Sequence, residues 1–162
     1  GGVREQRHGE EVGRRLAKTA EAEEMSDIAW GSKGCWDDPS GVMSRFRGLL
    51  TIKQDFVEAN PTYLIEHDDT GEKLGFYALE KKNGGWWLRH MWVLPEEIGT
   101  GLGGKLFLHA CEIAETMGAE ELNILSDPNS EEFYIHMGAE RAGETECKEI
   151  PGWTQPVLRI KL

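Results

Sequence analysis

The sequence predicts an α+β fold in three layers (α/β/α), with helices on both faces of a mixed and mostly antiparallel central sheet. Three observations predict this fold. Asn83-Gly84 is the strongest hairpin signal in the chain, because both residues tolerate positive φ. Residues Gly101–Met117 carry an apolar stripe at helical spacing, and Gly118 closes that helix. A strand-like run on each side makes this helix the crossover between two parallel strands.

Two helices are expected before the sheet. The first, Glu10–Met25, has a weakly apolar face, and a glycine-rich, polar loop, Gly31–Gly41, separates it from the second, Val42–Leu50. Asn60-Pro61 ends any helix, and the residues after it alternate as a strand. The expected strands are Thr62–His67, Lys73–Lys81, Trp86–Val93, Glu121–Leu125, Arg141–Cys147 and Val157–Leu162. A short helix, Glu131–Met137, is expected between the fourth and the fifth of these strands.

The length of 162 residues fits one domain over residues 1–162, and 18 Lys and Arg against 29 Asp and Glu give a net charge of −11. This balance argues against a nucleic-acid partner. No apolar run could cross a bilayer and no signal peptide is visible, so we expect a cytoplasmic protein without a membrane partner. Cys35, Cys111 and Cys147 are too scattered for a disulfide framework or a metal site. Both a monomer and a homodimer are open.

The most informative segment is the glycine-rich loop Val93–Lys105, which joins a strand to the N-terminus of the best-defined helix. Glycines let backbone N–H groups crowd around an anion, and the helix dipole adds partial positive charge. The loop therefore predicts a phosphate or pyrophosphate site. In so acidic a chain, the anion must be held by local amides, with Lys105 as a further candidate contact.

Two phosphate-binding templates overlap in this loop. A G-x-G-x-x-G pattern begins at Gly99, and Asp127 ends the following strand, as in dinucleotide-binding folds. Four residues separate the preceding strand from the glycines, however, where that fold turns at once, so a dinucleotide site is a distant alternative. The same stretch also resembles a P-loop, which needs a Ser or Thr hydroxyl after the lysine to bind magnesium. Leu106 stands at that position, so we exclude the P-loop.

A third template fits better. Val93-Leu94-Pro95 and Ile98–Gly103 resemble the acyl-CoA pyrophosphate loop of the GNAT superfamily, usually Gln/Arg-x-x-Gly-x-Gly/Ala after a strand ending in Val-x-Pro. Ile98 departs from that pattern at a position that contributes mainly its backbone amide. Asp127–Ala139 resembles the later motif of the same superfamily, with Phe-Tyr before a glycine. Two motifs in the right order on the right elements make the resemblance specific.

Further segments are similar to a bacterial branch of the superfamily, so the resemblance covers nearly the whole chain beyond about residue 30: Ser32–Trp36, Asn60–Glu66, Gly75–Glu80 and Ile150–Trp153. It implies a GNAT-like acyl-CoA N-acyltransferase fold with acetyl-CoA as cosubstrate and no metal. The residues that it implies as cofactor contacts are Met91, Trp92, Val93, Ile98, Gly99, Thr100, Gly101, Leu102, Gly103, Gly104, Asn129, Phe133 and Tyr134.

Acetyl transfer to an amine needs a neutral amine, a stabilised oxyanion and a protonated leaving thiolate. By resemblance, Tyr134 is the general acid, and backbone N–H groups of Met91–Val93 polarise the thioester carbonyl. Counting residues from the Asn83-Gly84 turn places Glu80 opposite Trp87, which makes Glu80 our first candidate base or amine anchor. A water relay is the alternative. His90 should face the other way, with Tyr77, unless a β-bulge re-aims it.

Aromatic side chains fall where such folds build the acceptor pocket, together with one arginine: Trp36, Trp87, Arg89 and Trp153. The acidic balance would favour a cationic acceptor. The sequence thus predicts an N-acetyltransferase that moves an acetyl group from acetyl-CoA to a primary amine, that of a small molecule. The alternatives are a CoA-binding sensor or inactive GNAT-like protein and, more distantly, the dinucleotide-binding domain.

Overall fold

The central feature of the fold is one mixed sheet, seen in a computed structural model that describes residues 12–33, 44–147 and 150–162. Its seven strands lie in the order β1-β2-β3-β4-β5-β7-β6. Only β4 and β5 pair in parallel among the described strands, and the other pairs are antiparallel. The strands are β1 Val12–Leu16, β2 Thr62–His67, β3 Lys73–Lys82, β4 Gly85–Val93, β5 Glu121–Leu125, β6 Glu140–Glu146 and β7 Thr154–Lys161.

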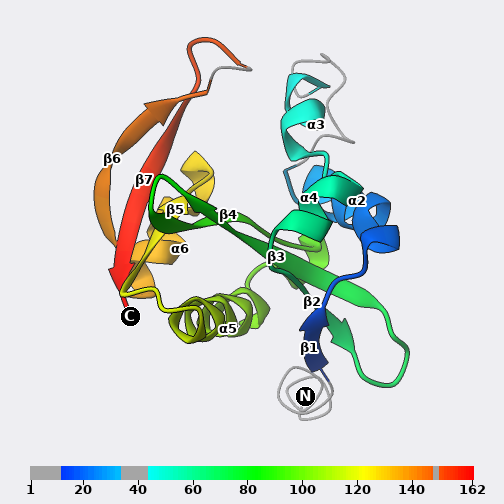
Figure 1. The fold of residues 1–162 in the computed structure, drawn as a ribbon. Helices are drawn as coiled ribbons and strands as arrows, with labels where there is room; N and C mark the ends of the chain where they lie inside the picture. Colours follow the sequence, from blue (N-terminus) through cyan, green and yellow to red (C-terminus); the bar gives the residue numbers. More distant parts are fainter. Residues whose placement is uncertain (1–11, 34–43, 148–149) are drawn as a thin grey trace.

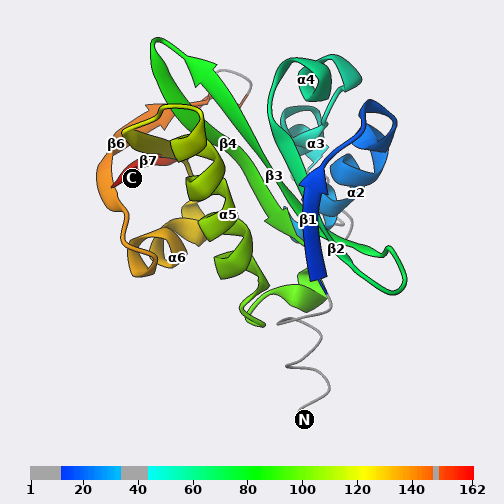
Figure 2. The same cartoon turned by 60° about the horizontal axis from the view of Figure 1, so that its bottom comes forward.

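Helices cover both faces of this sheet, so the predicted three-layer α+β fold is confirmed (Figures 1 and 2). One face carries α5 (Leu102–Thr116) and α6 (Glu131–His136), packed on a core around Phe107 and Tyr77. The other face carries the remaining helices, packed on a core around Met25 and Phe76. These are α2 Ala22–Lys33, α3 Ser44–Leu50 and α4 Gln54–Ala59, and short 3-10 turns precede α2, α5 and α6 at Thr19–Glu21, Pro95–Glu97 and Pro128–Ser130.

The expected helix at Glu10–Met25 is wrong in its first half. Residues 12–16 form β1, which pairs antiparallel with β2 from Val12↔His67 to Leu16↔Tyr63. Because Val12 and Leu16 are four residues apart, they fit a helical face and a strand face equally well. These residues form a strand because pairing with β2 gives hydrogen-bond partners to backbone N–H and C=O groups of β2.

The expected loop Gly31–Gly41 is also partly wrong, because α2 continues through Lys33. The rest of that loop lies outside the described residues, as do the first two residues of the expected helix Val42–Leu50. Helix α4 has only six residues and was not expected. Within the part of the chain that the structure describes, no helix is long and apolar enough to span a bilayer.

The hairpin prediction is confirmed in detail. Asn83 and Gly84 have φ values of 53° and 79°, Lys82 pairs with Gly85, and Glu80 pairs with Trp87. Beyond this point the register shifts, because His90 pairs with Ala78 while Leu88 pairs with Leu79.

Arg89 is therefore the extra residue of a β-bulge in β4, and the bulge changes which side chains face which core. Leu88 faces the α5 side, but so do Met91 and Val93, whereas Trp92 packs on the other core. His90 lies with Phe76, ring centroids 6.3 Å apart. His90 therefore faces away from Tyr77, because the β-bulge named above as the exception is present and re-aims it.

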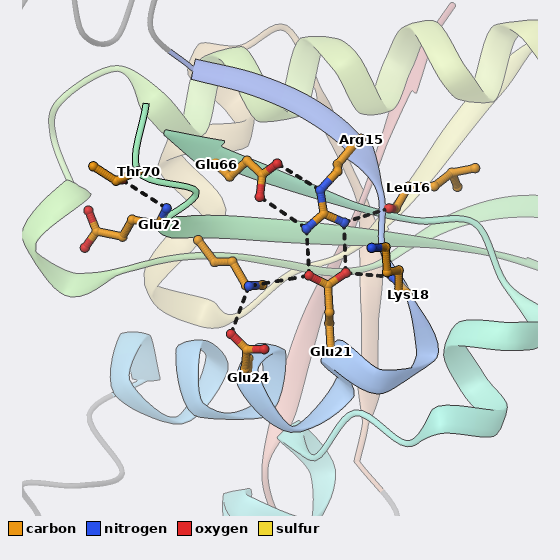
Figure 3. A network of polar contacts seen from close by, with 9 residues as sticks. Arg15, Leu16, Lys18, Glu21, Glu24, Glu66, Thr70 and Glu72 are labelled. Carbon is orange, nitrogen blue, oxygen red and sulfur yellow. Dashed lines mark hydrogen bonds and ion pairs between the residues drawn. The ribbon is translucent and has the colours of Figure 1, made fainter. Parts of the chain in front are cut away.

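A network of ion pairs ties the start of α2 to the edge of the sheet (Figure 3). The Arg15 guanidinium donates to both carboxylate oxygens of Glu21, at 2.8 and 2.6 Å, and of Glu66, at 2.9 and 3.1 Å. Lys73 Nζ lies 3.5 Å from Glu21 and 3.0 Å from Glu24. These bonds, above all those from Arg15, lower the pKa of Glu21 to about 2.

Candidate active site

A hollow of about 730 Å³ opens beside β4, between the end of α2 and the glycine-rich loop. It is large enough for a sizeable ligand. Its wall comes from four regions of the chain: Ser32 and Lys33; Met91, Trp92 and Val93; Glu97, Ile98, Gly99, Gly101, Gly103 and Gly104; and Asp127, Asn129, Ser130, Phe133, Tyr134 and His136.

The glycine-rich loop gives this hollow its anion-binding character. Gly99 and Gly101 have φ values of 85° and 90°, which side chains disfavour, and Gly101 directly precedes the first turn of α5. The first N–H groups of a helix have no partner within it, and they carry partial positive charge. Thr100 and Leu102, also expected as cofactor contacts, do not line the hollow: Leu102 is fully buried, and the Thr100 hydroxyl donates to Glu97 O at 2.7 Å.

The strand β4 contributes backbone as well as side chains. It pairs with β5 at only three positions, from Trp86↔Leu122 to Leu88↔Ile124. Beyond the bulge, Met91–Val93 have no strand partner on the β5 side among the described residues, and they line the hollow. Backbone groups on such a splayed edge are open to hydrogen bonding by a ligand.

A second, much smaller hollow of about 30 Å³ adjoins the first. Six residues line both: Lys33, Met91, Trp92, Asp127, Ser130 and Tyr134. We call these six the junction. The small hollow alone is lined by Arg89, His90, Trp153 and Gln155, among others. The small hollow has room for little more than a water molecule, and the junction is the wall that it shares with the large one.

Tyr134 is the buried phenol of the junction. Its ring packs edge-on against Phe107 and Phe133, with centroids 5.5 and 5.2 Å away. Burial raises the pKa of Tyr134, and the nearby negative charge of Asp127 raises it further. The phenol therefore keeps its proton at neutral pH.

Lys33 and Asp127 form a buried ion pair across the junction. Lys33 is the last residue of α2, and Asp127 follows β5; the Lys33 ammonium donates to Asp127 Oδ2, and the side chains are 9% and 7% exposed. Lys33 Nζ also lies 4.8 Å from the ring centre of Phe46 and 5.3 Å from that of Trp153. The sequence reasoning did not single out this pair, because 94 residues separate its members.

The residues expected in the acceptor pocket are only partly together. Arg89 and Trp153 line the small hollow, whereas Trp36 lies outside the described residues. Glu80 and Trp87 are not among the described residues that line either hollow; the Glu80 carboxylate lies 4.0 Å from Arg89 Nε.

His90, which lines the small hollow, was left outside the expected site. Burial, together with the charge of Arg89, lowers its pKa to about 3, so the imidazole is neutral at physiological pH. The bulge that turns His90 toward this hollow has no signature in the sequence.

Trp92 and the cysteines complete the inventory of reactive and polar groups. Trp92 Nε1 is buried and has no hydrogen-bond partner within the described ranges. Burial raises the pKa of the Cys111 thiol to about 11, and Cys147 is buried in the core. Among the residues described, no group of three or more His, Cys, Asp or Glu side chains is arranged to hold a metal ion.

A splayed β4–β5 pair, a glycine-rich loop leading into a helix, and a buried tyrosine beside the gap are what the resemblance to the GNAT superfamily implied. A comparison with family models agrees with this resemblance. Residues 22–139 match the model of the acetyltransferase (GNAT) family, which is more than half of the chain. The chain belongs to this family of acyltransferase enzymes, as the resemblance predicted.

Solved structures give the same fold at low sequence identity. A GCN5-related N-acetyltransferase from Rhodopseudomonas palustris superposes with a TM-score of 0.76 at 15% identity, covering 94% of this chain and 96% of that one. The PaiA N-acetyltransferase of Thermoplasma acidophilum, solved in complex with coenzyme A, has a TM-score of 0.73 at 14% identity, covering 93% and 99%. An IAA acetyltransferase from Bacillus cereus has 0.63 at 19%, covering 93% and 99%. No curated protein matches the sequence.

Proposed function

We propose that this chain is an N-acetyltransferase that moves an acetyl group from acetyl-CoA to a primary amine of a small molecule. The observation that carries the proposal is the position of Tyr134, a buried and protonated phenol at the place where the two hollows meet. In this arrangement acetyl-CoA occupies the large hollow, and the amine nitrogen reaches the junction from the side of the small one. The Thermoplasma relative was solved in complex with coenzyme A, which supports coenzyme A as the kind of ligand that this fold binds.

The pyrophosphate of acetyl-CoA would lie against the loop at Gly99–Gly104 and the first turn of α5. The amides there supply hydrogen bonds and partial positive charge without any need for basic side chains. Ile98 lines the large hollow, but its amide already donates to Pro95 O at 3.3 Å, so the phosphates would be held by the first turn of α5 and not by the amide of Ile98.

The chemical step would use backbone and side chain together. N–H groups of Met91–Val93 polarise the thioester carbonyl, the amine attacks its carbon, and the C–S bond breaks. Tyr134 then gives its proton to the departing thiolate of CoA. Asp127 and Glu80 are the two carboxylates that compete for the role of base. Asp127 is favoured, because it lines both hollows and Glu80 lines neither.

Trp153 and Arg89 would shape the acceptor pocket, with Trp36 and Trp87 as further proposed contacts. Trp153→Ala should raise the KM for the amine several-fold and leave that for acetyl-CoA unchanged. An equal change in both constants would show that Trp153 only supports the fold.

The proposal is tested by thiol release from acetyl-CoA against a panel of small amines. Turnover with at least one amine is expected, and Tyr134→Phe should lower kcat by about a hundredfold while CoA still binds. Tight CoA binding without turnover, unchanged by Tyr134→Phe, would indicate a CoA sensor instead. Thermal stabilisation by NAD and not by CoA would indicate a dinucleotide-binding domain.

A further inference from the structure

The Lys33–Asp127 pair stands where the proposed acetyl donor and acceptor meet. Both residues line both hollows, as Tyr134 does. Lys33 therefore brings a primary amine of the chain itself to the place where an external amine would react.

The surroundings of Lys33 Nζ are those of a binding site for an alkylammonium group. A carboxylate accepts its hydrogen bond, and the rings of Phe46 and Trp153 lie 4.8 and 5.3 Å away, within the range of cation–π attraction. Removing two charges from water is costly, and a buried ion pair is weak evidence for stability. A role in binding or chemistry accounts better for a pair buried beside a cleft.

We propose that Lys33 is an internal acetyl acceptor: with acetyl-CoA bound and no external amine present, the enzyme acetylates Lys33 Nζ. The inference rests on the proposed function, because acetyl-CoA must occupy the large hollow. It adds a modification site in the acceptor pocket. It also defines the acceptor class, because an amine that replaces Lys33 against Asp127 must carry its nitrogen on a slender alkyl chain.

The step balances with groups at the junction. Asp127 takes one proton from the Lys33 ammonium, and the neutral nitrogen attacks the thioester carbon. The C–N bond forms, the C–S bond breaks, and the CoA thiolate takes the proton of Tyr134. The second proton lost by the nitrogen restores Tyr134, and Asp127 releases the first to solvent. The products are acetyl-Lys33, free CoA and one proton.

Acetylation would change the pocket, because the amide of acetyl-Lys33 is neutral. It would end the ion pair with Asp127 and the attraction to the two rings. Asp127 would keep the hydrogen bond that its Oδ1 accepts from Asn129 N, at 2.9 Å, and its Oδ2 would be left without a cation and able to bind the ammonium of an external amine.

The test is to incubate the full chain with acetyl-CoA in the absence of amines and follow its intact mass, with peptide mapping of the modified lysine. Lys82, exposed at the end of β3, reports chemical acetylation without catalysis. We expect one acetyl group on Lys33, at least tenfold faster than on Lys82. Lys33→Arg, which keeps the charge beside Asp127, should abolish the modification, and the matched control Lys82→Arg should not. Tyr134→Phe should slow it by about a hundredfold.

Equal rates at Lys33 and Lys82, or a rate unchanged by Tyr134→Phe, would overturn the inference and leave the pair a structural contact. Thiol release with external amines, measured on the same preparation, separates the two proposals. Turnover of amines without acetylation of Lys33 rejects the inference alone. Absence of CoA binding rejects the proposed function as well. Thermal melts of both arginine variants confirm that each is folded.

Discussion

The two ends of helix α2 are both anchored by ion pairs, yet the pairs differ in every physical respect. At the start of the helix, Arg15 makes two hydrogen bonds to each of Glu21 and Glu66, and its side chain is 33% exposed. At the end, Lys33 makes one contact to Asp127, and both side chains are below 10% exposure. The first network is remote from both hollows, whereas the second lines both.

This difference indicates that the Arg15 network serves stability and that the Lys33–Asp127 pair serves chemistry. A guanidinium that holds two carboxylates in paired geometry, with water still near, gains hydrogen bonds at small desolvation cost. A single ammonium–carboxylate contact between buried side chains recovers less of its desolvation cost. The Arg15 network should therefore affect folding alone, and the Lys33–Asp127 pair should affect both folding and acetyl transfer.

The largest effect is expected from Asp127→Ala. It leaves the Lys33 ammonium buried beside Phe46 and Trp153 without a counter-charge, and it removes the hydrogen bond that Asp127 Oδ1 accepts from Asn129 N. Together these losses should lower the free energy of unfolding by about 3 kcal/mol. Urea unfolding followed by fluorescence measures this loss. Replacing both partners, Lys33→Met with Asp127→Leu, should restore stability to within about 1 kcal/mol, which is the size of a lost N-cap bond. If the double variant is as unstable as the single one, the pair contributes directly to stability.

Arg15→Met should lower the free energy of unfolding by about 2 kcal/mol, because charged hydrogen bonds to two carboxylates are lost together. The kcat for amine acetylation should not change, since Arg15 lies outside both hollows. Unfolding in urea and thiol release provide the two measurements. A fall in kcat at full occupancy of both substrates would contradict the separation of the two ends.

Acid should reveal the same network. The pKa of Glu21 is about 2 in the folded protein and near its ordinary value of 4.5 when unfolded. A lowered folded-state pKa gives stability that is complete above pH 4.5 and is lost as the pH falls toward 2. Between about pH 6 and pH 3, the wild type should lose about 1 to 2 kcal/mol more than Glu21→Gln. Parallel pH profiles of the two proteins would show that the pairing with Arg15 is not formed.

The smallest effect is expected from Lys73→Met. Lys73 bridges Glu21 and Glu24, but the Glu24 side chain is 56% exposed, and exposed ion pairs contribute little. We expect a change in the free energy of unfolding below about 0.5 kcal/mol, and less still in high salt. A loss as large as that of Arg15→Met would place Lys73 at the centre of the network.

Local sequence signals predicted much of the fold. The hairpin, its register and the crossover helix each rest on residues close together in the chain, such as Asn83-Gly84 and the stripe of α5. Strand β1 was missed because its state depends on pairing with β2, about 50 residues later. Two periodicities fitted its few apolar residues, and only the sheet edge distinguishes them.

The candidate site shows the same limit. The glycine-rich loop and Tyr134 belong to local motifs, and the structure brings their residues to one hollow. Lys33 and Asp127 meet only because α2 packs beside the end of β5. This contact cannot be predicted from the spacing of residues in the sequence. His90 faces the small hollow because of the bulge. Leu102 lies within the glycine-rich motif, but it is buried in the core because it belongs to the apolar face of α5.

The bulge at Arg89 shifts the alternation of side chains along β4 by one residue. Even-numbered residues before it, Trp86 and Leu88, face the α5 core, and odd-numbered residues after it, Met91 and Val93, take over that side. One residue thus lets a single strand serve two alternation patterns. Deleting Arg89 would turn every side chain from His90 to Val93 to the opposite face of the sheet. Trp92 would then point toward α5, and Met91 would point away from it, so the wall of the junction would be lost.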